Sequence, residues 1–522
     1  MNASVARIAA IVRADFWIRF RRVSTLVVFL LLSAFAYVWV PPPSSGRALV
    51  QINGHRALNT SGAIGLGTAS IGMIFVGLFG FYVISNTIRR DITTRCGLVA
   101  ASTPMRSWEY LFGKFCGNLA FLVTFLGGFM LSSMAMLAVR GEGPFQPFVF
   151  VEQYLLLTPA AIVFVSAAAV LFESIPLLAG KFGDLVYFFF WMAMIGLVVA
   201  NESTHGAINW ARCFDFTGFG FMINQMQETL HTESVAIGSS PFDPTKTPID
   251  FAGLTLTPAW VLPRVISVLV PLLMLPVAGW FFHRFDPVRT RKASAKTSRN
   301  WIGKVQSLLK PITRRVVALA GAFGRGGSLG GAIWRDAWLT FTLYPLALVA
   351  LVASAIATFA APLASVLPAV FAALALVISD VATRDARAGT IVSLRAIPRL
   401  RERYVWWKLG SILLLSLLFC AAAICRTLPR GPLALGALLG GMIFIAAAAT
   451  ALGIISTNPK TFIVGFLSFW YVVVNDRGAH PIWDFAGFYG RATPGTIALY
   501  AGLSVLAIVL AEVSYRVRLT RS

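Results

Sequence analysis

The sequence contains few charged residues for its length. Only 12% of its 522 residues are Asp, Glu, Lys or Arg, which is about half of the share in an average soluble protein. Acids are the scarcest class, with 21 Asp and Glu against 44 Lys and Arg. Hydrophobic residues make up 57% of the chain. This composition excludes an ordinary soluble domain and predicts a membrane protein with many spans.

The residue patterns of metal, disulfide and nucleotide sites are also missing. The five cysteines form no CxxC pair, and the five histidines form no HExxH motif. No Gly-Lys pair is followed by Ser or Thr, so the chain has no phosphate-binding loop. One GxSxG match, residues 326–330, lies in a Gly-rich stretch with no strand expected before it. We therefore expect no metal, no bound cofactor and no catalytic residue, and hence no enzymatic activity in this chain alone.

The net charge of +23 would suit a nucleic-acid-binding protein, but its distribution favours another explanation. The basic residues lie in short loops between apolar runs, as the positive-inside bias of membrane proteins requires. With the N-terminus inside, the expected inner loops hold 32 Lys and Arg, and the outer loops hold nine. This asymmetry predicts that both termini are cytoplasmic, and it leaves no reason to expect a nucleic-acid partner.

Apolar segments of nearly membrane-spanning length recur along the whole chain. We predict spans at residues 23–41, 66–86, 112–138, 152–172, 184–200, 259–282, 343–361, 363–382, 406–425, 432–455, 460–475 and 495–514.

The N-terminal segment 4–22 is basic and has one apolar stripe, so we expect it to lie as a helix in the plane of the membrane surface. The alternative is that it only begins the first span. The N-terminus also resembles a signal peptide, but the apolar run continues to Val40, which favours a retained span.

One loop occurs twice. Residues 85–118 return as residues 379–412 at a constant offset of 294. The pairs that coincide without a gap are Arg90 with Arg384, Asp91 with Asp385, Pro104 with Pro398, Tyr110 with Tyr404, and Lys114 with Lys408.

A second match joins the segments that precede the first span of each half. Both contain Asp-x-Trp-x-x-Phe, at an offset of 321. The matched residues are Asp15, Trp17 and Phe20 in the first half, and Asp336, Trp338 and Phe341 in the second. The first half therefore carries 27 extra residues, which we place in the loop 42–65.

These observations predict an all-α polytopic membrane protein. Its fold would contain about 12 transmembrane helices, arranged as two parallel six-helix repeats with interfacial amphipathic helices. The predicted parts are a first repeat (1–283) with a long outer loop (201–257), a basic cytoplasmic linker (284–327) and a second repeat (328–522). The linker holds eleven Lys or Arg and one acid; it either binds anionic headgroups or is a solvated tether.

The repeated loop is cytoplasmic by the charge count, and its Arg-Asp pair predicts a docking surface for a partner protein. Proline is tolerated in a first helical turn, so Pro104 and Pro398 are expected to restart a helix. Tyr110 and Lys114 would then share one helix face at the headgroup level. The alternative is that any inner loop near a headgroup collects Arg, Tyr and Lys.

The order of basic helix, two spans and the segment around Arg90 to Lys114 resembles the ABC-2-type permeases of ABC exporters, over nearly the whole chain. This resemblance implies a permease that is coupled to a separate ABC ATP-binding subunit, in two copies, which holds the ATP and Mg. Segment 4–22 would be the connecting helix, and the loop 201–257 would cover the outer gate. The residues that the resemblance assigns to ATPase coupling are Arg90, Asp91, Pro104, Glu109, Tyr110, Lys114, Arg384, Asp385, Pro398, Tyr404 and Lys408.

The second coupling loop departs from the first, because Arg403 stands in the place of Glu109 and Ile391 in the place of Gly97. One of the two ATPase contacts is therefore expected to be weaker. The alternatives for the whole protein are an ion-coupled secondary transporter and a non-transporting membrane scaffold. No deep charged pair in the predicted spans marks an ion relay.

An apolar, aromatic path would suit an amphipathic or hydrophobic cargo. Residues 188–191 (Phe-Phe-Phe-Trp) are candidates for its lining, or they are only lipid-facing or packing surface. The Ala-, Val- and Arg-rich composition favours a bacterial inner membrane.

Overall fold

The computed structural model divides the chain into two compact units, Met1–Ser294 and Ala295–Ser522. The residues that it describes are 3–21, 23–201, 210–230, 235–282, 285, 311, 315, 328–397 and 401–520. The boundary between the units falls inside the segment 284–327 that the sequence predicts as a linker, and most of that segment lies outside the described residues.

The first unit consists mainly of helices. Its elements in chain order are α1 (Ala3–Phe20), α2 (Val23–Trp39), η1 (Pro43–Ser45), β1 (Arg47–Ile52), β2 (His55–Arg56), α3 (Ser61–Phe75), η2 (Val76–Gly80), α4 (Phe81–Ile84), α5 (Thr87–Thr93), α6 (Cys96–Ser102), α7 (Ser107–Arg140), α8 (Pro147–Ser174), α9 (Lys181–Asn201), η3 (Trp210–Phe214), α10 (Phe219–Leu230), β3 (Val235–Pro241), α11 (Pro258–Leu269), η4 (Val270–Leu273) and α12 (Met274–Phe281).

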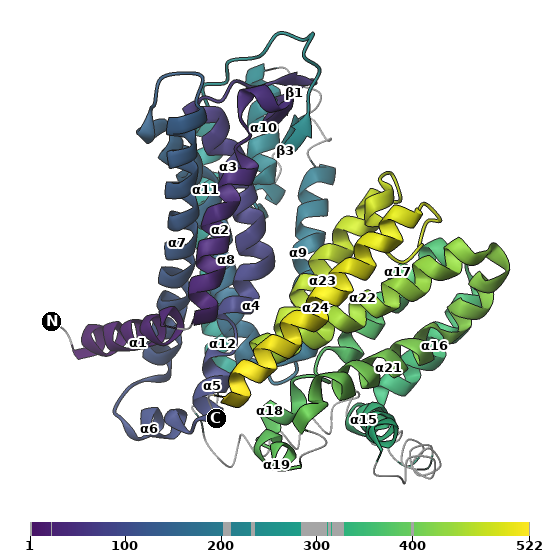
Figure 1. The fold of residues 1–522 in the computed structure, drawn as a ribbon. Coiled ribbons are helices and arrows are strands. Elements are labelled where there is room, and N and C mark those ends of the chain that lie inside the picture. The colour runs from purple at the N-terminus through teal and green to yellow at the C-terminus, as the bar shows by residue number, and fades with distance from the viewer. Residues whose placement is uncertain are drawn as a thin grey trace. The chain divides into compact units, whose positions relative to one another are not determined.

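Within this unit α2, α3, α7, α8 and α11 run side by side, and α1 crosses them at one end (Figure 1). A three-stranded antiparallel sheet of order β2-β1-β3 lies at the other end. β1 and β2 come from the loop 42–65, whereas β3 comes from the loop 201–257, so the two loops form one structure. The all-α prediction missed this sheet.

The second unit is helical throughout its described residues. Its elements are α15 (Leu329–Leu343), α16 (Leu346–Ala360), α17 (Leu363–Ile378), α18 (Arg384–Ala388), α19 (Ile391–Arg395), α21 (Tyr404–Thr427), η5 (Leu428–Arg430), α22 (Pro432–Ser456), α23 (Pro459–Asp476), η6 (Pro481–Trp483) and α24 (Pro494–Thr520). α15 and α16 are bent by 100° at the break between them. Such a bend would let α15 lie along a membrane surface while α16 enters the membrane.

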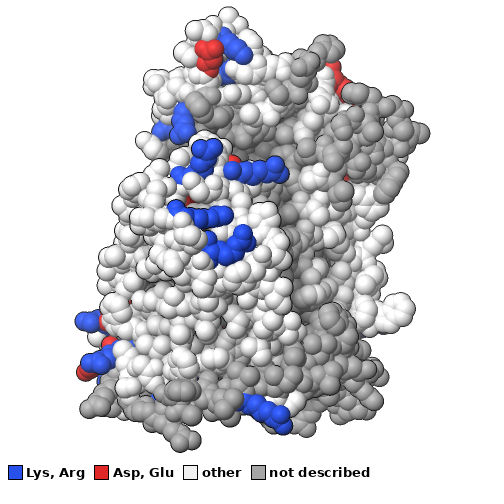
Figure 2. Space-filling model, turned by 90° about the vertical axis from the view of Figure 1, so that its right-hand side faces the viewer, with Lys and Arg blue, Asp and Glu red and all other residues white. Residues whose placement is uncertain are grey.

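Many helices have the length and composition of membrane spans. Among the described residues, seven helices are long and apolar enough to cross a membrane, or eight if the bent pair counts as one span. Every one of the twelve apolar segments predicted as a span contains helix. Wide areas of the face drawn in Figure 2 carry no charged side chain. The chain is a membrane-embedded helical protein.

The 27 extra residues of the first unit fall in two places. Between α2 and α3 lie 21 residues, which include β1 and β2, whereas two residues separate α16 from α17. The continuous helix from α3 to α4 has 24 residues, against 16 in α17. The prediction placed all of the extra residues in the loop 42–65, but the structure assigns eight of them to a longer helix.

The long helix α3–α4 contains a π-helical turn at η2, next to α9. Tyr187 on α9 donates its hydroxyl hydrogen to the Gly77 carbonyl at 2.7 Å. A β-carbon on Gly77 would lie 1.9 Å from a ring carbon of Trp191. The absence of a side chain at Gly77 therefore allows α9 to approach closely. This packing buries Phe188 and Trp191, two of the four aromatic residues proposed as a cargo lining, while Phe189 and Phe190 stay exposed.

We predict that Gly77→Ala lowers the melting temperature of the purified protein, by the equivalent of about 1–3 kcal/mol, because the added methyl group displaces Trp191. Gly127→Ala is the matched control, since no atom lies within 4 Å of the β-carbon that it adds on α7. Alanine is favoured over glycine inside a helix, so the control is expected to be neutral or stabilising. Equal melting temperatures for the two variants would contradict the packing argument.

Candidate functional site

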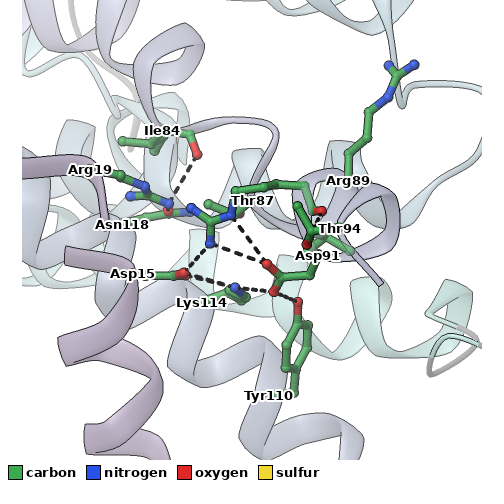
Figure 3. Close-up of polar contacts among 12 residues, drawn as sticks. Asp15, Arg19, Ile84, Thr87, Arg89, Asp91, Thr94, Tyr110, Lys114 and Asn118 are labelled. Carbon is green, nitrogen blue, oxygen red and sulfur yellow. Dashed lines mark hydrogen bonds and ion pairs between the residues drawn. The ribbon is translucent and has the colours of Figure 1, made fainter. Parts of the chain in front are cut away.

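A buried ion-pair network joins three elements of the first unit. Lys114 on α7 is 2% exposed, and its ammonium lies 2.9 Å from Asp15 on α1 and 2.6 Å from Asp91 on α5. Arg90 contacts the same two carboxylates, at 2.6 Å and 3.3 Å. Tyr110 donates a hydrogen bond to Asp91 at 2.7 Å (Figure 3). Side chains 99 residues apart in the sequence thus meet in one place.

The local structure of α5 brings Arg90 and Asp91 into this position. Asn86 has a left-handed backbone, with φ of 77°, and breaks the helix between α4 and α5. The Glu173 carboxylate at the end of α8 then accepts hydrogen bonds from the backbone N–H groups of Thr87 at 3.0 Å and Ile88 at 2.6 Å. A carboxylate at a helix N-terminus satisfies free N–H groups and complements the helix dipole. Glu173 therefore fixes the start of the helix that carries the Arg-Asp pair.

The ion pairs join two carboxylates to two cations, and Arg19 adds a third positive charge nearby. Burial alone would raise the pKa of Asp15, but Lys114, Arg19 and Arg90 outweigh it and lower that pKa. Asp15 therefore stays ionised at neutral pH. A buried charge without its partner costs several kcal/mol, so each member of the network depends on the others.

The second unit contains the same network. Lys408 on α21 is fully buried, and its ammonium lies 3.1 Å from Asp336 on α15 and 2.6 Å from Asp385 on α18. Arg384 contacts Asp336 at 3.3 Å. Tyr404 donates to Asp385 at 3.1 Å. Each contact joins residues that correspond through the two sequence matches.

One difference between the networks involves a pair of positions. In the first unit Arg19 donates to Asn118 at 2.6 Å. Thr340 and Ile412 occupy the corresponding positions in the second unit, and there Arg384 donates to the Thr340 hydroxyl at 2.8 Å. Both positions therefore differ between the units: a charged and a polar side chain form a pair in the first, whereas a hydroxyl and an apolar side chain stand there in the second.

A second difference is a clamp that only the first unit carries among the described residues. Glu109 accepts hydrogen bonds from Ser4 at 2.5 Å, from Arg7 at 2.8 Å and from the backbone of Arg106 at 2.7 Å. Arg403 stands at this position in the second unit and is exposed. The clamp holds the start of α1 against the start of α7.

An aromatic stack closes the network from the side of the last helix in each unit. The ring of Phe282, directly after α12, stacks on Tyr110 with centroids 5.3 Å apart. Tyr515 on α24 stacks on Tyr404 at 5.0 Å. Four elements therefore meet at each network: the first helix of the unit, the loop helix, the helix after the loop and the last helix.

The equivalence continues at the opposite end of the helices, beyond the two sequence matches. Arg140 at the end of α7 donates to the carbonyls of Tyr37 and Val40. Arg426 on α21 donates to the carbonyls of Thr358 and Ala361. The four acceptor residues match at the same offset of 321 that joins Asp15 to Asp336. The arginines satisfy carbonyls that have no partner at a helix end.

A five-residue turn is also repeated. Residues 215–219 (Asp-Phe-Thr-Gly-Phe) match residues 484–488 (Asp-Phe-Ala-Gly-Phe) at an offset of 269. Both aspartates are buried and accept backbone N–H groups: Asp215 from Gly218 at 2.8 Å, and Asp484 from Arg491 at 2.7 Å. The glycines of both turns have positive φ, 74° and 68°, a conformation that favours glycine. A search of the sequence for DFxGF could have found this repeat.

The other predicted site residues that the structure describes do not join the networks. Pro104 lies between α6 and α7, and α7 begins three residues later at Ser107, so the prediction that this proline restarts the helix was wrong. Pro398 lies outside the described residues. Trp17 is exposed, whereas Phe341 is buried. Phe20 packs against Trp17, and Trp338 packs against Phe341.

The sequence matches single out Asp15 and Asp336 without revealing that they form ion pairs. The Arg-Asp pairs were predicted as docking surfaces, whereas the structure places their charges in ion pairs within each unit. A signal was present, because Asp15 is the only acid in the first 22 residues and its counterpart Asp336 is alone among residues 328–343. A single acid that recurs at matching positions of two otherwise basic or apolar segments indicates a partner for the basic residues that also recur.

No family model matches the sequence, and neither a curated protein nor a solved structure matches it. The functional interpretation therefore rests on the contacts described above.

We predict that Lys114→Met destabilises the first unit by roughly 3–5 kcal/mol, because it leaves the buried Asp15 and the partly buried Asp91 with too little positive charge. Lys408→Met is expected to do the same in the second unit. Hydrogen exchange distinguishes the two, since each variant should increase exchange mainly in its own loop helix, α5 or α18. Lys246→Met, at an exposed position, is the control, and exchange as slow as in this control would contradict a structural role for the networks.

A pH prediction follows from Asp15. Its pKa is lowered below the ordinary 3.8, so its contribution to stability is complete above pH 3.8 and is lost as the pH falls through the lower folded value. Asp15→Asn should therefore melt at a lower temperature than the wild type at pH 7, and the gap should narrow below pH 3.8. Asp250→Asn, an exposed loop variant, serves as the control. A gap that stays constant down to pH 3 would refute the assignment.

Proposed function

We propose that this chain is the transmembrane permease subunit of an ATP-driven exporter of the ABC-2 type. It would work with a separate ATP-binding subunit, in two copies, which binds the ATP and Mg. The chain would span a bacterial inner membrane twelve times, as two six-helix repeats with cytoplasmic termini, and would move an amphipathic or hydrophobic cargo.

The observation that carries this proposal is the pair of matching networks. In each unit, a short loop helix is tied by buried ion pairs to an amphipathic first helix and to the base of a long apolar helix. A force on the loop helix would be transmitted to these elements, because moving α5 alone would separate Arg90 and Asp91 from Asp15 and Lys114. A coupling loop in an ATP-driven permease needs this mechanical connection.

The exposed residues of the first loop support a partner on this side. Ile92, Leu98 and Val99 on α5 and α6 are 47%, 47% and 68% exposed. A small hollow of about 10 Å³ lies next to them in the chain, and its lining includes Ala100, Met105, Tyr110 and Phe285. Exposed apolar side chains that lie close together are typical of protein interaction sites. We therefore propose that the apolar residues seat the ATP-binding subunit, while the charged residues hold the loop in shape.

The repeated contacts outside the networks support the two-repeat part of the proposal. The Arg140 and Arg426 caps, the stacks on Tyr110 and Tyr404, and the two DFxGF turns fall in the same order along both units. A gene duplication accounts for this order more simply than independent origins do. Two equivalent coupling loops in one chain would engage two copies of one ATP-binding subunit.

We predict that Val99→Asp greatly reduces recovery of the ATP-binding subunit when the tagged chain is purified from its native cells, while the melting temperature of the chain stays unchanged. A charge in an apolar contact has to be desolvated, which costs affinity. Thr93→Asp, also exposed and on α5, is the matched control for the added charge.

The double variant Arg90→Glu with Arg384→Glu is expected to abolish the association as well, but with a lower melting temperature, because it places a third carboxylate in each network. The proposal would be refuted if the wild-type chain binds no ATP hydrolase and transports with an ion gradient alone. Such a result would favour the ion-coupled transporter, and binding without any transport would favour a scaffold.

A further inference from the structure

Three arginines lie exposed at one end of the second unit, where α21 meets α22 and α23 meets α24. They are Arg430, Arg477 and Arg491, and none has an ion-pair partner among the described residues. We call these three residues the arginine patch. A guanidinium that is free on a surface has five N–H donors available for an anion.

The DFxGF turn of this unit holds part of the patch in place. Asp484 is 1% exposed, and its carboxylate accepts the backbone N–H groups of Tyr489 at 3.2 Å and Arg491 at 2.7 Å. The Arg491 side chain passes over Gly478, where an added β-carbon would lie 3.1 Å from its Cγ. Arg477 directly precedes this glycine, so Arg477 and Arg491 are brought close together by a rigid turn.

Arg430 joins them from the neighbouring helix. Gly487, in the same turn, lies against Ala434 and Ala437 of α22, and Arg430 ends η5 just before α22 begins, four residues before Ala434. The equivalent turn of the first unit has no such group, because Met222, at the position of Arg491, is buried. The patch is therefore a property of the second unit.

The carboxylates near the patch are already engaged. Asp476 binds the ring and the backbone N–H of His480, at 2.7 Å and 2.9 Å, and Asp484 is occupied by backbone donors. Figure 2 shows Lys and Arg side chains gathered on the face that it draws, with few acidic side chains among them. The local charge is thus positive and is not neutralised within the unit.

Exposed apolar side chains border the arginines. Leu428 and Leu433 flank Arg430 in sequence and are 63% and 46% exposed, and Ile482 is 51% exposed. α22 and α24, which begin here, are both long and apolar enough to span a membrane. The arginines therefore lie where a span meets the membrane surface. The charge count predicts this end to be the outer one, so the positive-inside bias does not account for them.

We infer that the arginine patch binds the phosphate-bearing headgroup of an anionic membrane lipid. Guanidinium groups bind phosphate oxygens through paired N–H donors, and the bordering leucines and isoleucine would contact the acyl chains. A purely polar anion would gain nothing from these apolar residues. An acidic protein partner would find the arginines at the level of the headgroups, where lipid competes with it.

The test uses the full chain, purified in a mild detergent, with phosphatidylglycerol and phosphatidylcholine of identical acyl chains. Native mass spectrometry measures how much of each lipid stays bound. The wild type is expected to bind phosphatidylglycerol more tightly than phosphatidylcholine. The triple variant Arg430→Gln, Arg477→Gln and Arg491→Gln is expected to bind phosphatidylglycerol about a hundredfold more weakly, since it removes three basic residues that contribute about 1 kcal/mol each near a headgroup. Its phosphatidylcholine binding should not change.

A matched control removes the same charge at the other end of the second unit, with Arg387→Gln, Arg401→Gln and Arg403→Gln, all at exposed positions. The inference is supported if this control still binds phosphatidylglycerol more tightly than phosphatidylcholine while the patch variant loses that preference. Equal losses in both variants, or no preference in the wild type, overturn it. Competition by inorganic phosphate as strong as that by phosphatidylglycerol would assign the patch to a soluble anion and would also overturn the lipid site.

Discussion

Each unit is organised around one lysine ammonium buried between two carboxylates. Lys114 and Lys408 lie within 3.1 Å of both of their aspartates, and the matching arginine balances the remaining charge. Removing these groups from water is expensive, and only well-formed contacts offset the cost. The contacts exist only if α1, α5 and α7, or α15, α18 and α21, hold one relative position. The network therefore fixes the relative position of these helices more than it adds to net stability, and it ties the loop helix to the long helices.

The two units agree most closely where these networks lie and differ most at the other end. The helix α3–α4 is eight residues longer than its counterpart in the second unit. α7 is longer by the same number, as the sequence spacing shows: Arg140 lies 26 positions after Lys114, whereas Arg426 lies 18 positions after Lys408. Two neighbouring helices have thus grown together, by roughly 12 Å at 1.5 Å per residue. The sheet of β1, β2 and β3 lies beyond them. We interpret the shared end as common machinery for coupling and the divergent ends as the parts that distinguish the units.

The divergent end of the first unit is held by many directed contacts. The side-chain amide of Gln153 donates to the Leu254 carbonyl and accepts from the Leu254 N–H, and Arg56 forms two hydrogen bonds with Glu142. Arg264, buried on α11, donates to the carbonyls of Leu156 and Asp215. The described parts of the loops 42–65 and 201–257 are therefore tied to α7, α8 and α11. Each unit contains a Thr-Pro pair. Arg264 lies seven residues after Thr257, and Tyr500 lies seven residues after the threonine of the second pair. The Tyr500 hydroxyl donates to the Ile482 carbonyl. This end of the second unit is shorter and carries the arginine patch instead.

The sequence by itself determined the helical segments, the registers of the repeat and the residue pairs that correspond, because apolar runs and ungapped matches are local properties of the chain. It placed Asp15, Arg90, Asp91, Tyr110 and Lys114 in a candidate site without showing that they touch. Only the tertiary structure decided that the Arg-Asp pairs form internal ion pairs, that two distant loops form one sheet, and that an aromatic on or directly after the last helix of each unit covers each tyrosine. These contacts join residues up to about 190 positions apart, and the energy that selects them, the mutual compensation of buried charges and the pairing of strands, exists only when the distant segments meet.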